Sequence, residues 1–120
     1  MSFAYEKLEV WEKSKDLVVN VYLLLGQFPN TEKYSLCDQL RRSAVSVPSN
    51  IAEGSGRFSL KEKIHFVEIA YGSLTETFCQ LQLAKELKYI SGESITILRP
   101  KFEEVARMLS GYRNSLLSKL

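Results

Sequence analysis

The sequence is poor in cysteine, proline and glycine: its 120 residues include 2 Cys, 3 Pro and 6 Gly. Cys37 and Cys79 lie far apart in the sequence and form no C-x-x-C pair, which disfavours a disulfide framework and a cysteine metal site. We interpret both as small hydrophobic residues of a protein in a reducing cytosol, and expect a cytoplasmic protein. The scarcity of Gly and Pro disfavours a turn-rich, all-β fold.

Long apolar runs and an excess of one charge are also missing. The most apolar run, residues 17–25, is interrupted by Asn20, and a membrane span needs ~20 apolar residues, so we expect no membrane partner. The N-terminus has no apolar segment after a basic start, which disfavours a signal peptide. The net charge is only +2, so any affinity for a polyanion must come from uneven placement of charge.

Helical periodicity dominates what remains. Apolar residues make up 45% of the chain, and they recur at steps of three and four in four segments, at about residues 5–27, 32–53, 59–90 and 95–116. No segment alternates as a strand would. With short connections between the segments, the sequence predicts one all-α domain over residues 1–120, an antiparallel up-down-up-down four-helix bundle.

A few residues mark the expected helix ends. Pro48 lies inside the second segment and predicts a kink or a break there. Gly54 suits the left-handed position after a helix, and Gly92 suits the end of the third segment. Ser59 and Glu62 fit a capping box at the start of the third segment.

Catalytic and metal-binding patterns are weak. Residues 62–65 read E-x-x-H, as in di-iron bundle proteins, but such a site needs a second copy of the motif and the chain has 1 His. The glycines in residues 54–57 lack the spacing of a phosphate-binding loop, and no strand precedes them. We therefore expect no metal, no cofactor, no catalytic residue and no enzymatic activity.

Two polar stripes run along the second and third segments. The first comprises Gln39, Ser43, Ser46, Asn50 and Glu53, and the second comprises Ser73, Glu76 or Thr77, and Gln80. One interpretation is that the stripes meet in a partly buried network, with Glu53 or Glu76 bonded to Arg41 or Arg42. In the alternative, each stripe is solvated.

Small residues favour the first interpretation, because Ala70, Gly72 and Ser73 would let a partner helix approach closely.

Basic residues outnumber acidic ones in residues 33–63 and from residue 93 onward. Arg57, Phe58 and Lys61 place a guanidinium, an aromatic ring and an ammonium group on one turn, a combination suited to phosphate contact and base stacking. Solvated faces carry such clusters too. The candidate nucleic-acid-binding residues are Arg41, Arg42, Arg57, Lys61, Lys63, Arg99, Arg107 and Arg113.

One stretch resembles a known family. Residues 39–54, QLRRSAVSVPSNIAEG, are similar to the Q-L-R-R-A-x-x-S-I-P-x-N-I-A-E-G run of the 23S rRNA intervening-sequence proteins, also called four helix bundle proteins. The resemblance extends over nearly the whole chain, through LEVW (8–11), FP (28–29), YSL (34–36), GSLTE (72–76) and KYI (88–90).

The resemblance implies a small up-down bundle that assembles into a homopentameric ring. Members of the family were first noticed as reading frames inside elements inserted in bacterial 23S rRNA genes. The fold is similar to that of the accessory proteins of diversity-generating retroelements, which bind nucleic acid. The family supplies no catalytic residue, and its motif implies an architectural role, with Pro48 shaping the second helix and Asn50, Glu53, Ser73 and Glu76 in the polar network.

Two function classes follow. The first is a homo-oligomer that binds structured RNA or another nucleic acid; five copies of a chain with net charge +2 would carry 5 × 2 = +10. The second is a scaffold whose ring binds another protein, such as an element-encoded partner, with no direct contact to nucleic acid.

Overall fold

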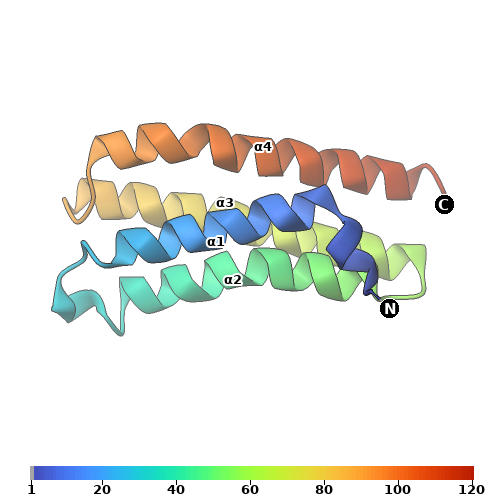
Figure 1. Ribbon diagram of the computed structural model, residues 1–120, viewed down its shortest axis with the longest axis horizontal. Helices are drawn as coiled ribbons and strands as arrows, with labels where there is room; N and C mark the ends of the chain where they lie inside the picture. Colours follow the sequence, from blue (N-terminus) through green and yellow to red (C-terminus); the bar gives the residue numbers. More distant parts are fainter. Residues whose placement is uncertain (1) are drawn as a thin grey trace.

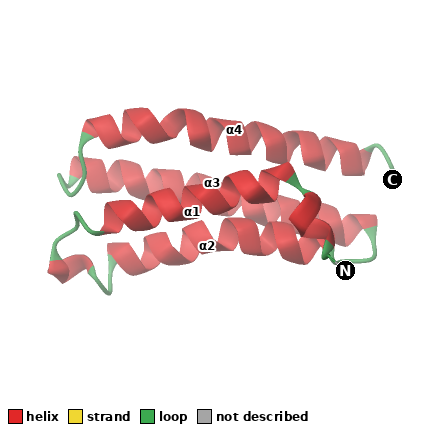
Figure 2. Ribbon diagram, viewed as in Figure 1, coloured by secondary structure: helices red, strands yellow, loops and turns green. Residues whose placement is uncertain are grey.

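The computed structural model describes residues 2–120, and every regular element among them is helical. The prediction of an all-α chain built from four main helices is therefore confirmed. The helices are α1 (Glu9–Leu25), α2 (Leu36–Ser55), α3 (Leu60–Glu86) and α4 (Gly92–Leu117), with short 3-10 helices η1 (Ala4–Lys7) and η2 (Asn30–Glu32). Successive helices run in opposite directions along a rod of 46 × 24 × 23 Å (Figure 1). The connections between them are short (Figure 2). No helix in the described residues is both long and apolar enough to cross a membrane.

The helices pack around a square. α2 packs most extensively against α3, and further contacts join α3 to α4, α1 to α2 and α1 to α4. Within residues 2–120 the diagonal pairs, α1 with α3 and α2 with α4, have no Cα atoms within 8 Å of each other. Functional residues on α2 and α4 are therefore held on opposite sides of the bundle.

The apolar seam of α4 faces the core. Ile95, Leu98, Phe102, Val105, Leu109 and Leu116 are all buried. α1 carries two adjacent apolar stripes, and only one of them is buried. The buried stripe includes Val10, Leu17 and Val21. In the other stripe Trp11 and Val18 are half-buried and Tyr22 is exposed. α1 therefore carries more apolar surface than the bundle itself covers.

Pro48 lies inside α2, which continues as an α-helix on both sides of it, so no break occurs there. The kink stays a prediction. At the start of α3, the backbone N–H of Glu62 donates to the Ser59 hydroxyl oxygen at 3.1 Å, which is the Ser59 half of the predicted capping box.

The roles predicted for Gly54 and Gly92 are wrong. Gly54 is helical and has no positive φ; it is needed because α3 approaches so closely that an added Cβ would lie 2.7 Å from the Cβ of Phe66. Gly92 is the first residue of α4, whose N-cap is Ser91.

The left-handed residue after α3 is Lys88, with φ 66°. The backbone N–H of Tyr89 donates to the Ala84 carbonyl at 2.9 Å and that of Lys88 to the Lys85 carbonyl at 2.9 Å. This pattern is a Schellman motif with a lysine in the position that glycine prefers.

Candidate functional site

The polar stripes of α2 and α3 meet in a hydrogen-bonded seam. Ser43 is buried, and its hydroxyl oxygen lies 2.9 Å from the amide oxygen of Gln80 and 2.9 Å from the hydroxyl of Thr77. Thr77 also lies within hydrogen-bond distance of the Ser73 carbonyl, at 2.8 Å. Because these side chains are small, the two helices can pack closely while each buried hydroxyl keeps a partner.

The seam continues toward the C-terminal end of α2. The hydroxyls of Ser46 and Ser73 are 2.8 Å apart, and the side-chain amide of Asn50 donates to the Ser46 hydroxyl at 2.8 Å. At the other end, the Gln80 amide donates to the Gln39 amide oxygen at 3.4 Å. Six residues of the stripes were the main candidates for the network: Gln39, Ser46, Asn50, Glu53, Ser73 and Glu76. The structure brings four of them together, and the two glutamates are the exceptions.

The two predicted carboxylates do not join this seam. Glu53 forms an ion pair with Arg57, which lies four residues further on, in the turn after α2. Glu53 cannot reach Arg41 or Arg42, because those residues lie roughly 18 Å from it along the helix axis at ~1.5 Å per residue. In the described residues Glu76, the other predicted carboxylate, forms no ion pair with either arginine. Glu76 is exposed and lines a polar groove over the seam. Arg42 and Gln39 line the same groove.

The basic residues near the start of α2, Arg41 and Arg42, both bind oxygen atoms of the chain itself. The Arg41 guanidinium donates to the Lys33 carbonyl at 2.8 Å, which ties the α1–α2 connection to the helix. Arg42 forms an ion pair with Asp38 at 2.9 Å. Both charges are therefore partly used within the chain.

The turn between α2 and α3 carries the second group. Arg57 pairs with Glu53 and lies over the ring of Phe66, with 4.7 Å from the guanidinium carbon to the ring centroid. The Lys63 ammonium group donates to the Ser55 carbonyl at 2.9 Å and so caps the end of α2.

Two side chains of this turn have no such role. Lys61 is exposed, and no hydrogen bond or ion pair engages its ammonium group within residues 2–120. Phe58 beside it is fully exposed. The turn therefore presents a free cation and an uncovered aromatic ring to solvent.

The basic residues of α4 are spread along the helix. Arg99 lies over the ring of Phe78 on α3 at 4.8 Å, and Arg113 pairs with Glu68 on α3 at 2.7 Å. Arg107 is exposed. The eight predicted basic residues thus form three separate groups. One lies near the start of α2 and one around the α2–α3 turn, at the opposite end of that helix (Figure 1). The third lies along α4, which is diagonal to α2.

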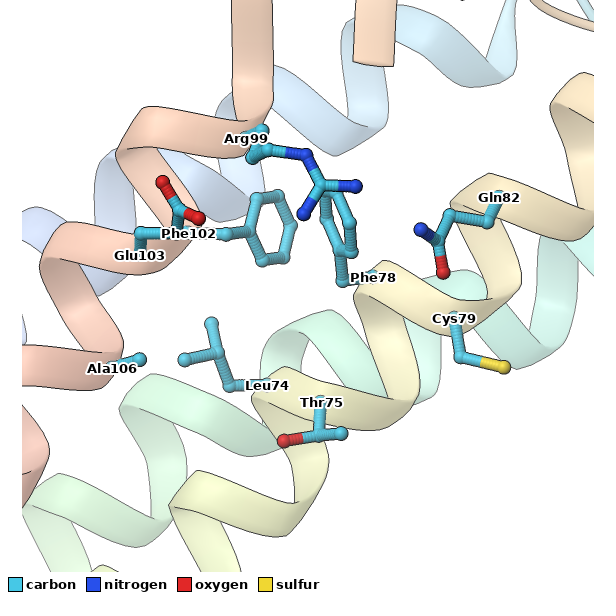
Figure 3. A pocket seen from close by; sticks show the side chains of 9 residues that line it. All are labelled: Leu74, Thr75, Phe78, Cys79, Gln82, Arg99, Phe102, Glu103 and Ala106. Carbon is cyan, nitrogen blue, oxygen red and sulfur yellow. The ribbon is translucent and has the colours of Figure 1, made fainter. Parts of the chain in front are cut away.

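A hollow of about 240 Å³ between α3 and α4 was not predicted from the sequence. It has an apolar floor and a polar rim, and the side chains of both appear in Figure 3. Arg99 is the one predicted site residue among them. The contact between Arg99 and Phe78 joins two helices, so no local spacing in the sequence could have revealed the hollow.

Titratable groups offer no catalytic pair. Burial raises the pKa of the Cys37 thiol, which keeps it protonated and unreactive near neutral pH. Burial also raises the pKa of Tyr112. His65 is exposed, and the described part of the chain holds no group of three or more His, Cys, Asp or Glu side chains that could bind a metal ion.

These features define the class: an all-helical four-helix bundle protein with a hydroxyl and amide seam between its second and third helices. The chain matches the model of the 23S rRNA-intervening sequence protein family over residues 6–111, and it belongs to that family. It is also similar to a solved structure from Bacteroides thetaiotaomicron, described as a protein of unknown function from the S23 ribosomal protein family. The two are 26% identical, with a TM-score of 0.79, over 87% of this chain and 97% of that one. No curated protein matches the chain.

Proposed function

We propose that this protein is a non-enzymatic homo-oligomer, a pentameric ring in our reading, that binds structured RNA or another nucleic acid. The observation that carries the proposal is that Phe58 and Lys61, three residues apart at the α2–α3 turn, are both exposed. A fully exposed phenylalanine contributes nothing to the core of its own chain. Beside a free lysine, it offers a base-stacking surface next to a phosphate contact.

The position of the turn adds to this. Lys61 is in the first turn of α3, a helix of 27 residues, where the backbone N–H groups and the helix dipole also favour an anion. The ion-paired Arg57 and the capping Lys63 hold the turn in place rather than supply free charge. We therefore assign the phosphate contact chiefly to Lys61, and treat Arg57 and Lys63 as supporting it.

Exposed apolar residues support self-association. Val19 and Leu23 on α1, Leu83 on α3 and Ile97 on α4 are each more than half exposed. A contact between different faces of neighbouring copies closes into a ring when the rotation allows it. A ring would present the α2–α3 turn once per copy, so weak contacts would act together on one polyanion.

The proposal is tested by fluorescence anisotropy with a labelled RNA hairpin, a DNA duplex and a single strand at two salt concentrations. Lys61→Glu should weaken binding and reduce the salt dependence, and Phe58→Ala should weaken binding at both salt concentrations equally. Lys101→Glu is the matched control, because Lys101 is an exposed lysine in the interior of α4. Light scattering on the same samples measures the number of copies.

One observation favours a protein-binding scaffold instead. Arg41, Arg42, Arg57, Lys63 and Arg113 all donate to oxygen atoms of the chain itself, which lowers the charge left for a polyanion. If the wild type binds none of the three nucleic acids at low salt, the scaffold becomes the better proposal. A protein partner that stays bound after nuclease treatment would then support it.

A further inference from the structure

The hollow between α3 and α4 has the size of a site for one ring system. Its volume is about 240 Å³, below the ~300–1,000 Å³ of pockets that hold drug-sized ligands. It lies open at the surface between the two helices, and its apolar floor is formed by Leu74, Phe78, Phe102 and Ala106 (Figure 3). A flat ring could therefore enter edge-first, whereas a duplex could not.

The hollow already contains one stacked pair. The guanidinium of Arg99 lies 4.8 Å from the centroid of the Phe78 ring, and Phe78 in turn packs against Phe102 at 5.1 Å between centroids. Arg99 is exposed, so its side chain is accessible to a ligand. An aromatic ring placed on that plane would extend the stack, because arginine stacks on aromatic faces on either side.

The rim supplies hydrogen-bonding groups of both kinds. Glu103 follows Arg99 by one helical turn, yet the two form no ion pair in the part of the chain that the structure describes. The Glu103 carboxylate is thus left as an acceptor, and the Arg99 guanidinium as a donor. Gln82, on α3, adds an amide on the opposite side of the hollow from Glu103 (Figure 3).

We propose that this hollow binds a single unpaired nucleobase from a loop or single-stranded segment of RNA, with guanine preferred. The inference rests on the proposed function, because it assumes that the protein binds nucleic acid. Unpaired bases are recognised by stacking on arginine planes and aromatic rings and by hydrogen bonds to their edges. Guanine offers acceptors at O6 and N7 to the Gln82 amide, and donors at N1 and N2 to Glu103, while its face stacks on Arg99. Adenine has one donor group, the N6 amino group, and no adjacent N1–H, so it cannot form the same paired hydrogen bonds to the carboxylate.

The test uses two labelled RNA hairpins with identical stems and uridine loops, one carrying a single guanosine in the loop and the other a single adenosine. The full-length protein is titrated with both hairpins and with the stem alone as a duplex. We expect the guanosine hairpin to bind about tenfold more tightly than the duplex, because the duplex offers no unpaired base to stack in the hollow. Free guanosine monophosphate, followed by NMR signals of the Arg99 and Gln82 side chains, gives a second readout that needs no RNA.

Three variants locate the contact. Arg99→Lys keeps the charge but removes the planar stack, so it should lose about tenfold in affinity for the guanosine hairpin and leave the duplex unchanged. Glu103→Gln should reduce the preference for guanosine over adenosine. Lys101→Arg is the matched control, because Lys101 is an exposed cation of α4 that does not line the hollow.

The outcomes separate this inference from the proposed function. If the wild type binds neither these RNAs nor the DNA duplex and single strand, the proposed function fails, and the hollow loses its polymer ligand with it. If the wild type binds all three RNAs equally and Arg99→Lys behaves like Lys101→Arg, the protein binds nucleic acid but the base site is overturned. Thermal unfolding of each variant must match that of the wild type. If Arg99→Lys does not fold, Ala106→Leu is the second test: it fills the hollow with an apolar side chain and should abolish the preference for guanosine.

Discussion

The hydroxyl of Tyr89 donates a hydrogen bond to Oε1 of Glu32 at 2.9 Å, joining two connections that lie 57 residues apart. Oε2 of the same carboxylate accepts the backbone N–H of Leu36 at 3.1 Å, at the start of α2. The Tyr89 ring also packs on Phe28, with 5.5 Å between ring centroids. One tyrosine thus locks the α1–α2 connection to the α3–α4 connection at the same end of the bundle.

This link predicts a pH dependence of stability. The Leu36 N–H and the Tyr89 hydroxyl lower the pKa of Glu32 from 4.5, so its contribution is present above pH 4.5 and is lost as the pH falls through the lowered value. The hydrogen bond to Glu32, together with desolvation, raises the pKa of Tyr89 from 10.0, so its contribution is present below pH 10.0 and is lost as the pH rises further.

Tyr89→Phe should therefore lower the melting temperature most between these two pH values, and the difference from wild type should shrink at both extremes. Thermal unfolding by circular dichroism across the pH range measures this. Tyr34→Phe is the control, because Tyr34 is exposed near the same connection. A difference from wild type that stayed constant from acid to alkaline pH would show that the hydroxyl bond does not link these groups.

Lys88 predicts a stabilising substitution. It is the only described non-glycine residue with a positive φ, and a side chain there costs ~1–2 kcal/mol in the left-handed region. Lys88→Gly should raise the free energy of unfolding by about 1 kcal/mol relative to Lys88→Ala, which loses the same charge but keeps the strain. Urea unfolding of the two variants measures the difference, and equal midpoints would contradict the strain assigned to this residue.

Gly54 and Gly72 predict opposite effects of the same change. An added Cβ at Gly54 would lie 2.7 Å from the Cβ of Phe66, whereas one at Gly72 meets no atom within 4 Å. Gly54→Ala should destabilise the protein by about 1–3 kcal/mol, because the backbones of α2 and α3 must move apart. Gly72→Ala should stabilise it by about 0.5–1 kcal/mol, since alanine is the better helix former. Chemical denaturation of both variants checks the pair; stabilisation by Gly54→Ala would rule out the close approach.

Much of this fold could be predicted from the sequence, because helix periodicity is a local property. The seam of α4 recurs at steps of three and four, and its members are buried apart from the half-buried Tyr112. The roles of the glycines are harder to predict from the sequence. The close approach at Gly54 depends on Phe66, which lies on another helix, and the turn after α3 adopts its left-handed residue at a lysine. Neither fact is visible in the spacing of the chain.

The candidate site was predictable only in part, for a related reason. The seam residues repeat along α2 and α3, so their shared face could be predicted before their contacts were known. The partners of the arginines could not, since Arg113 pairs with Glu68 across two helices and Arg99 stacks on Phe78. Charge counts along the chain identified basic residues without showing which ones the chain itself already neutralises.

The seam gives the last prediction, a double-mutant cycle on Ser43 and Thr77. Both are buried and their hydroxyl oxygens are 2.9 Å apart. Thr77→Val keeps the shape but removes the hydroxyl, so it should cost about 1–2 kcal/mol by weakening the hydrogen bonding of Ser43. Ser43→Ala should cost a similar amount, because Gln80 loses a partner as well.

The double variant should cost less than the sum of the two, because the second substitution removes a group that the first has already deprived of a partner. The control is Thr75→Val, which removes an exposed hydroxyl bonded only to the Tyr71 carbonyl of its own helix and should change stability by less than about 0.5 kcal/mol. Strict additivity of the two seam substitutions would mean that the hydroxyls act independently. In that case each hydroxyl would stabilise the packing of α2 on α3 separately, without coupling through the seam.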